Sequence, residues 1–181
     1  MPLSTTPESP AHRRIAAVVM GVSGCGKTTV GAGIADKLGL RFVDGDSLHA
    51  PDSVAKMRAG TPLEDADRWP WLDRIAAVLG DAATSPGGVV VACSALKRVY
   101  RDRIRAAAPA VRFVFLDGTA ELIGTRLANR SGHYMPGALL ASQLRTLERP
   151  GADEPDVVRV PIDAAASHIV ESACAALTAQ V

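Results

Sequence analysis

Residues 21–28 read Gly21-Val22-Ser23-Gly24-Cys25-Gly26-Lys27-Thr28 and match the phosphate-binding pattern G-x-x-x-x-G-K-[ST]. An apolar run at residues 14–20 precedes this phosphate loop, and a helix-forming stretch at residues 29–38 follows it. In that context the glycines let successive backbone N–H groups point at an anion, and the positive end of the new helix adds to the attraction. The alternative is a glycine-rich turn that binds nothing. That alternative does not explain why Lys27 and Thr28 complete the pattern.

The residues of the phosphate loop predict a nucleotide site. We expect the whole loop, together with Thr29, to contact the nucleotide. Lys27 should reach the terminal phosphates and act in catalysis, and the Thr28 hydroxyl should bind Mg²⁺. ATP and Mg²⁺ are therefore the expected cofactors.

The composition narrows the class of protein. The chain has 181 residues, 48% of them hydrophobic, which suits one domain with a full core. A net charge of +1 gives no basic surface for nucleic acid. Its three cysteines are too few and too scattered for a disulfide framework, which favours a reducing, cytoplasmic location. No apolar run approaches the roughly 20 residues of a membrane helix, so we expect no membrane partner.

Apolar runs alternate with helical stretches along the chain. We expect a disordered tail at residues 1–12 and a single domain at residues 13–181. Runs rich in β-branched residues, without polar alternation, predict strands buried on both faces of a parallel sheet. These predicted strands are residues 14–20, 41–43, 88–93, 111–116 and 157–160. Helical spacing predicts helices at residues 29–38, 68–79, 97–108, 119–129 and near 169–177.

This alternation predicts a doubly wound α/β fold. In such a fold the ligand crevice lies outside the carboxyl ends of the strands. The second strand ends in Asp44-Gly45-Asp46. We assign Asp46 to the acceptor hydroxyl, as the catalytic base, and Asp44 to the water shell of the metal. The alternative is a solvated Asp-Gly turn whose acids only cap the next helix.

The segment between the second and third strands is where a mononucleotide kinase fold inserts its acceptor-binding residues. We expect His49 to donate to a hydroxyl, and Arg68 to grip an anionic acceptor through two parallel bonds. Arg58 is a further candidate on the acceptor side. Lys56 fits a solvated helix face better, and Trp71 fits core packing.

The third strand runs into a second group of acceptor candidates, Ser94, Lys97 and Arg101. Backbone N–H groups at the start of the following helix could hold a carboxylate or a hydroxyl. Lys97 and Arg101 lie four residues apart and should share one helical face. The alternative is a plain basic helix face. Cys93 fits a small buried residue better than a nucleophile.

A basic helix end precedes a glycine-containing break at about residues 130–136. Arg126 and Arg130 are spaced i and i+4, as expected for a lid whose arginines move onto the phosphates and neutralise charge in the transition state. We therefore place Arg126 and Arg130 in the nucleotide site, with Arg130 catalytic, and His133 on the acceptor side. The alternative is an exposed basic helix end that complements its own dipole.

Several strings, taken in order, carry a family resemblance from about residue 17 to the C-terminus. They are the phosphate loop, Asp44-Gly45-Asp46, His49, Lys56-Met57, Pro62-Leu63, Asp65-Ala66-Asp67-Arg68-Trp69-Pro70-Trp71-Leu72, Cys93-Ser94-Ala95-Leu96-Lys97, Tyr100-Arg101-Asp102, Arg130-Ser131-Gly132-His133 and Gln143. The chain resembles the gluconate kinases of the shikimate-kinase-like group. Ser131 departs from the pattern, because relatives often carry a charged residue there.

The resemblance implies a specific fold and activity. The fold is a three-layer P-loop kinase fold of the adenylate kinase type, with a five-stranded parallel sheet in the order 2-3-1-4-5 and a short lid. The activity is ATP-dependent phosphorylation of D-gluconate at its 6-hydroxyl by a homodimer. Arg68 and Gln143 would line the acceptor pocket, and Asp46 would sit at the acceptor hydroxyl.

Residue chemistry alone reaches less far than the resemblance. It indicates a Mg²⁺-dependent kinase for a small, hydroxylated, anionic acceptor. Two alternatives stay open at this point. One is another small-molecule kinase, acting on shikimate or a pentonate. The other is a non-catalytic ATP-binding module that senses nucleotide and signals to a partner.

Overall fold

The computed structural model describes residues 14–83, 87–129 and 137–179. The predicted tail at residues 1–12 and the predicted lid at residues 130–136, with Arg130 and His133, lie outside these ranges. The division into a tail, one domain and a lid therefore stays a prediction.

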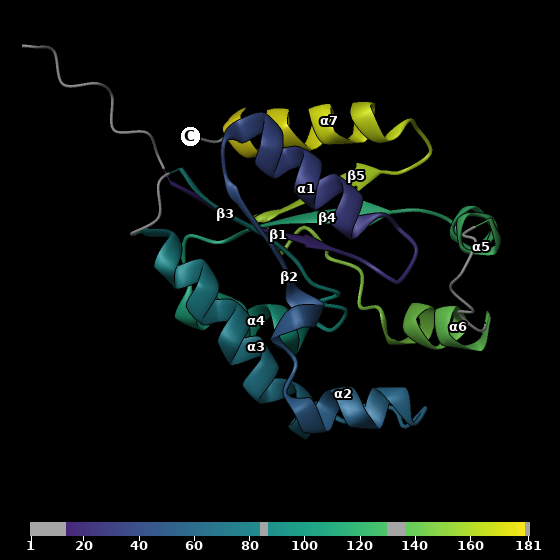
Figure 1. The fold of residues 1–181 in the computed structure, drawn as a ribbon. Coiled ribbons are helices and arrows are strands. Elements are labelled where there is room, and N and C mark those ends of the chain that lie inside the picture. The colour runs from purple at the N-terminus through teal and green to yellow at the C-terminus, as the bar shows by residue number, and fades with distance from the viewer. Residues whose placement is uncertain (1–13, 84–86, 130–136, 180–181) are drawn as a thin grey trace, which may run out of the picture.

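The fold is built on one parallel sheet (Figure 1). Its strands are β1 (Ile15–Met20), β2 (Arg41–Asp44), β3 (Gly88–Ala92), β4 (Arg112–Asp117) and β5 (Val157–Pro161). They pair in the order β2-β3-β1-β4-β5, and every pairing is parallel. This confirms the α/β fold class and the strand order that the resemblance implied.

The central strands are buried on both faces because helices cover both. Val18 of β1, for example, lies opposite Val91 of β3 and Phe113 of β4, and all three are fully buried. β-Branched residues pack well on such a surface. The edge strand β2 has partly exposed residues, so its pattern is less apolar.

Helices form the outer two of three layers. Figure 1 shows α1 (Lys27–Leu38) and α7 (Ala166–Ala179) on one face of the sheet, and α3 (Asp65–Gly80) and α4 (Arg98–Ala107) on the other. The remaining helical elements are α2 (Pro51–Arg58), α5 (Ala120–Ala128), α6 (Gly137–Thr146) and the 3₁₀ turns η1 (Gly45–Leu48) and η2 (Asp81–Ala83). Within residues 14–83, 87–129 and 137–179, no helix combines the length and the apolar character that a membrane crossing needs.

Each face of the sheet has its own hydrophobic core. Val19 packs with Ile34 of α1 and Leu177 of α7. Its neighbour Val18 points to the other face and packs with Leu72 of α3 and Ile104 of α4. Successive residues of a strand face opposite sides, so a single run such as β1 supplies both cores.

Several helix starts differ from the sequence prediction by one to three residues, and two of these differences have a clear local cause. The helix predicted at residues 68–79 begins earlier, at Asp65, because Glu64 and Asp67 form a capping box. The helix predicted at residues 97–108 begins at Arg98, because Lys97 is its N-cap with extended backbone angles (φ −91°, ψ 148°). Lys97 therefore lies outside the helix.

The carboxyl edge of the sheet is tightly packed at Gly45, directly after β2. A Cβ atom at this position would lie 2.3 Å from the Ala92 carbonyl oxygen and 3.5 Å from the Cys93 Cβ. The absence of a side chain at Gly45 thus lets the Asp44-Gly45-Asp46 turn approach the end of β3.

We predict that Gly45→Ala destabilises the fold by about 1–3 kcal/mol, the usual effect of overpacking. Urea unfolding followed by circular dichroism measures the change. Gly80→Ala is the matched control, because the nearest atom to its new Cβ would be the Ala107 carbonyl oxygen at 4.0 Å. That variant should match or slightly exceed the parent in stability, since Ala favours a helix over Gly. Equal stabilities for the two variants would contradict the prediction.

Candidate active site

The phosphate loop has a backbone conformation that glycine favours. Gly21, Gly24 and Gly26 have φ values of 145°, 85° and 100°. A Cβ at Gly24 would also lie 2.6 Å from the Cγ of Leu127. Helix α1 begins at Lys27 with no side-chain cap and no acidic residue in its first turn. Its terminal N–H groups and its dipole therefore suit an anion such as a phosphate group.

Two groups of the phosphate loop are held by contacts within the protein. The Lys27 Nζ donates to the Val22 carbonyl oxygen over 3.0 Å. The Ser23 N–H donates to Oε1 of Gln143 over 2.6 Å, which ties α6 to the loop. Gln143 thus contacts the phosphate loop in this structure, and its predicted contact with the acceptor stays a prediction.

A cavity of about 180 Å³ adjoins the phosphate loop. Its walls are residues 24–26, Thr29 and Val30 of α1, Arg126 of α5, and Ala166 and Ile169 of α7. The Arg126 guanidinium also donates to the Ile162 carbonyl oxygen. Arg126 and Thr29 therefore lie together beside the loop. Thr28 is exposed at the start of α1.

The two acids that follow β2 have different surroundings. Asp44 Oδ1 accepts the Asp46 N–H over 3.0 Å and so caps η1. At least one carboxylate oxygen of Asp44 therefore has the helix-capping role that the sequence analysis gave as the alternative. Asp46 is exposed at the carboxyl edge of the sheet. Of the two, Asp46 is the carboxylate that is open to an incoming acceptor.

His49 lies beside this turn and stacks on Trp71. The ring centroids are 4.3 Å apart with an interplanar angle of 12°. The Trp71 Nε1 donates to the Gly45 carbonyl oxygen over 2.7 Å, so this core residue also holds the turn. Burial lowers the pKa of His49, although Asp46 acts in the opposite direction, and the imidazole is neutral at pH 7. Its Nδ1 is buried and has no hydrogen-bond partner among the described residues, which marks a place for a polar ligand group.

A polar cluster, the Asp65 cluster, consists of Asp65, Arg68, Lys97 and Tyr100. The Lys97 Nζ lies 3.0 and 3.1 Å from the two Asp65 oxygens, and the Tyr100 hydroxyl donates to Asp65 Oδ1 over 2.5 Å. The Arg68 Nη1 donates to the Leu63 carbonyl oxygen over 2.8 Å and to the Tyr100 hydroxyl over 3.3 Å. Two cations and one carboxylate leave the cluster positively charged, which suits an anionic ligand.

The ionisation of the cluster follows from these contacts. The hydrogen bond from Tyr100, followed by that from Lys97, lowers the pKa of Asp65. The same contact with Asp65 raises the pKa of Lys97, and burial is the main cause of the raised pKa of Tyr100. At neutral pH the cluster therefore holds a carboxylate, a protonated lysine and a neutral phenol.

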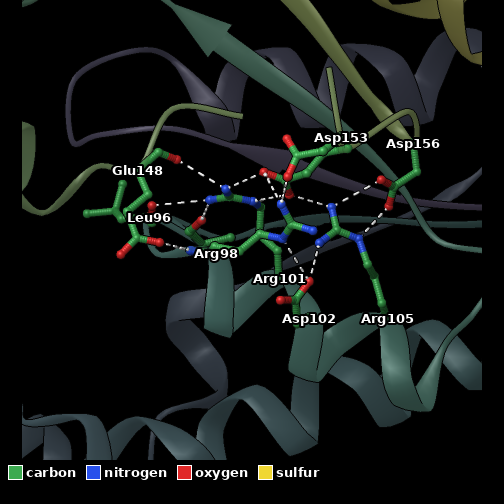
Figure 2. A network of polar contacts seen from close by, with 10 residues as sticks. Leu96, Arg98, Arg101, Asp102, Arg105, Glu148, Asp153 and Asp156 are labelled. Carbon is green, nitrogen blue, oxygen red and sulfur yellow. Dashed lines mark hydrogen bonds and ion pairs between the residues drawn. The ribbon is translucent and has the colours of Figure 1, made fainter. Parts of the chain in front are cut away.

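Arg101 does not lie on the acceptor side, so the structure contradicts its predicted role. Its side chain is 1% exposed and forms a bidentate pair with Glu154. The prediction is wrong because Lys97 precedes the helix, so residues 97 and 101 share no helical face. Figure 2 shows the surrounding network of Arg98, Arg101 and Arg105.

The comparisons with known proteins agree with this geometry. A model of the AAA domain family matches residues 17–150. A gluconokinase from Gluconobacter oxydans is 51% identical over 143 residues, which are 79% of this chain and 80% of the relative. The thermosensitive gluconokinase of Escherichia coli is 46% identical over 159 residues, which are 85% of this chain and 82% of the relative. The chain belongs to the gluconokinase family.

A solved structure in the gluconokinase family extends this similarity to the fold. The crystal structure of a gluconokinase from Sinorhizobium meliloti has a TM-score of 0.84 and 46% sequence identity. The match covers 92% of this chain and 93% of that chain. Membership of the gluconokinase family confirms the resemblance inferred from the sequence strings.

Four of the predicted acceptor residues lie in two different places in this gluconokinase-family structure. Arg68 and Lys97 come together in the Asp65 cluster, and Ser94 lies just before Lys97. Arg58 is exposed at the end of α2, away from the described contacts of the cluster. The sequence analysis gave no role to Tyr100, although the string Tyr100-Arg101-Asp102 was part of the family resemblance.

Tyr100→Phe tests the electrostatics of the Asp65 cluster. The pKa of Asp65 should rise toward its ordinary value of 3.8, because its main hydrogen-bond donor is lost. A folded-state pKa below the unfolded value stabilises the fold above that value, and the effect disappears as the pH falls through the folded-state pKa. The variant should therefore be less stable than the parent near neutral pH, and its stability should change less as the pH falls into the acid range. Carboxyl ¹³C NMR titration measures the pKa directly.

Asp73 is the internal control for this titration. Arg103, rather than Tyr100, lowers its pKa, so the Asp73 titration should be the same in both proteins. An unchanged Asp65 titration in Tyr100→Phe would contradict the contact.

Proposed function

We propose that this protein transfers the γ-phosphoryl group of ATP to the 6-hydroxyl of D-gluconate, giving 6-phospho-D-gluconate and ADP. One observation carries the proposal. The phosphate loop follows β1, and Lys97 of the cationic Asp65 cluster follows the neighbouring strand β3. A phosphate site and a site for an anionic acceptor therefore open at the same edge of the sheet, in a chain of the gluconokinase family.

On the nucleotide side, the backbone of the phosphate loop would surround the phosphates, with Lys27 on the terminal ones. Among the described residues, no group of three or more His, Cys, Asp or Glu side chains could hold a metal. Mg²⁺ typically binds through one or two protein oxygens plus substrate phosphates, which fits the Thr28 hydroxyl and the water shell at Asp44. When bound, the ion neutralises charge on the phosphates.

On the acceptor side, Arg68 and Lys97 would attract the carboxylate of gluconate. Neutral His49 would contact a hydroxyl of the polyol chain. Asp46 would orient the 6-hydroxyl and take its proton as the oxygen attacks the γ-phosphorus. The new O–P bond forms as the bond to the bridging oxygen of ADP breaks. Arg126 and Arg130 would stabilise the negative charge of the transition state.

We also propose that the protein acts as a homodimer in the cytoplasm. The dimer rests on the family resemblance, and light scattering after size-exclusion chromatography tests it. The location rests on the cysteines, since Cys25, Cys93 and Cys174 are all free and buried. Burial raises the pKa of Cys93 to about 12, so this thiol beside the site is inert as a nucleophile.

A substrate panel tests the proposed function. Purified protein with Mg²⁺ and ATP should produce ADP with D-gluconate and much less with pentonates, shikimate or nucleoside monophosphates. Turnover of nucleotides or shikimate without turnover of gluconate would overturn the proposal. Tight ATP binding without turnover on any acceptor would support the non-catalytic alternative.

Asp46→Asn separates catalysis from nucleotide binding. We predict that kcat falls by about 10²–10⁴-fold, the usual contribution of a general base, whereas the Kd for ATP changes little. Lys27→Ala is the contrasting variant and should weaken both ATP binding and transfer. Fluorescent-nucleotide titration and coupled ADP release measure the two effects. If Asp46→Asn lost ATP affinity but kept its kcat, the assignment of Asp46 would be wrong.

A further inference from the structure

Arg101 uses its whole hydrogen-bonding capacity inside the protein. A guanidinium has five N–H donors in a fixed planar fork. In Arg101, Nε and Nη2 each donate over 2.7 Å to one oxygen of Glu154. Nη1 donates to the carbonyl oxygens of Ala95 and Leu96 over 3.0 and 3.2 Å, and Nη2 also donates to that of Glu148 over 3.1 Å. This pattern matches arginine and no other side chain.

The two carbonyls that Nη1 holds belong to the 94–97 loop, the four residues between Cys93 and α4. Ala95 in this loop has φ 44°, and among the described residues it is the one non-glycine residue with a positive φ. A side chain in that conformation is strained and needs surrounding contacts to hold it. The grip of Arg101 on the Ala95 and Leu96 carbonyls is such a contact.

The 94–97 loop connects both halves of the proposed site. At its start, the Ser94 carbonyl accepts the N–H of Gly21, the first residue of the phosphate loop, over 3.3 Å. At its end, Lys97 contacts Asp65. A shift of this loop would therefore move Lys97 relative to both the Asp65 cluster and the phosphate loop.

Further hydrogen bonds surround the pair of Arg101 and Glu154 and hold the same segments together. The Glu148 N–H donates to the Leu96 carbonyl, and Oε2 of Glu148 accepts the Arg98 N–H over 2.5 Å. Arg105 donates to Glu154 Oε2 over 2.6 Å. Figure 2 shows the arginines of α4 reaching toward Glu148, Asp153 and Asp156, which lie in the 148–156 segment before β5. The 94–97 loop and the 148–156 segment, which are distant in sequence, thus meet at the guanidinium of Arg101.

Glu154 stays ionised over the working pH range. Burial opposes ionisation of Glu154, but hydrogen bonds from Arg101 and Arg105 outweigh it and lower the pKa of Glu154 to about 2. Replacing a buried ion pair by apolar residues is often neutral for stability, so the pair is better explained by the geometry that it imposes.

We propose that Arg101 is a positioning residue for the acceptor: with Glu154 it fixes the 94–97 loop so that Lys97 faces the Asp65 cluster. This inference rests on the proposed function for its kinetic readout. It goes beyond that function, because it assigns acceptor recognition to a residue that cannot touch the acceptor.

Arg101→Lys is the decisive variant, because lysine keeps the charge but lacks the fork. The KM for gluconate should rise by about tenfold or more, while the Kd for ATP stays within about twofold. Arg103→Lys is the matched control on the same helix. Arg103 also makes a bidentate pair, with Asp73, but it is exposed, and within the described part of the chain it forms no hydrogen bond or ion pair with the 94–97 loop. Its KM and Kd should both stay within about twofold of the parent.

A second readout does not depend on turnover. In Arg101→Lys the pKa of Asp65 should rise, because Lys97 is no longer held against it, and the Asp73 titration should not change. If Arg101→Lys does not fold, Glu154→Gln is measured in the same way, with the same expected shifts. A parent protein inactive on gluconate would overturn the proposed function, and the Asp65 titration would still decide the positioning role. An unchanged Asp65 pKa together with an unchanged gluconate KM in a folded variant would overturn the inference.

Discussion

Parallel pairing of β1 with β3 and β4 is the constraint on which the rest of the structure depends. Parallel strands end at one edge of a sheet, so the phosphate loop, the Asp44-Gly45-Asp46 turn and the 94–97 loop all begin there. The same pairing requires helices on both faces, and this supplies α1, whose uncapped start faces the phosphate loop. The fold therefore brings the proposed nucleotide and acceptor sites together before any catalytic side chain is considered.

The two sides of the site are built from different materials. The phosphate loop relies on backbone geometry, with glycines at positive φ and N–H groups at a helix start. The acceptor side relies on side chains from distant segments, such as Asp65 with Lys97 and Tyr100. Backbone geometry suits the phosphates of the nucleotide, and every kinase of this type binds those phosphates. Side chains, in contrast, can be changed to choose an acceptor.

This difference explains how much could be predicted from the sequence. The phosphate loop and the central strands are local patterns, so their positions followed from glycine spacing and β-branched runs. Arg101 was misplaced because the i, i+4 rule applies only inside a helix, and Lys97 lies one residue before it. Glu154 carried no local signal at all, since its contact with Arg101 spans 53 residues of sequence. Tyr100 could be identified as a member of the acceptor side only from the string Tyr100-Arg101-Asp102, which closely follows the string that ends at Lys97.

The buried pair of Arg101 and Glu154 belongs to the acceptor side, where side chains from separate segments must be held together. A site built from side chains on separate segments needs those segments held in register, and apolar packing tolerates small shifts that would misplace a charged group. A planar guanidinium with every donor occupied tolerates far less, because any shift leaves a buried carbonyl or carboxylate without its donor. Acceptor choice would thus depend on an ion pair that lies beneath the surface residues that make the choice.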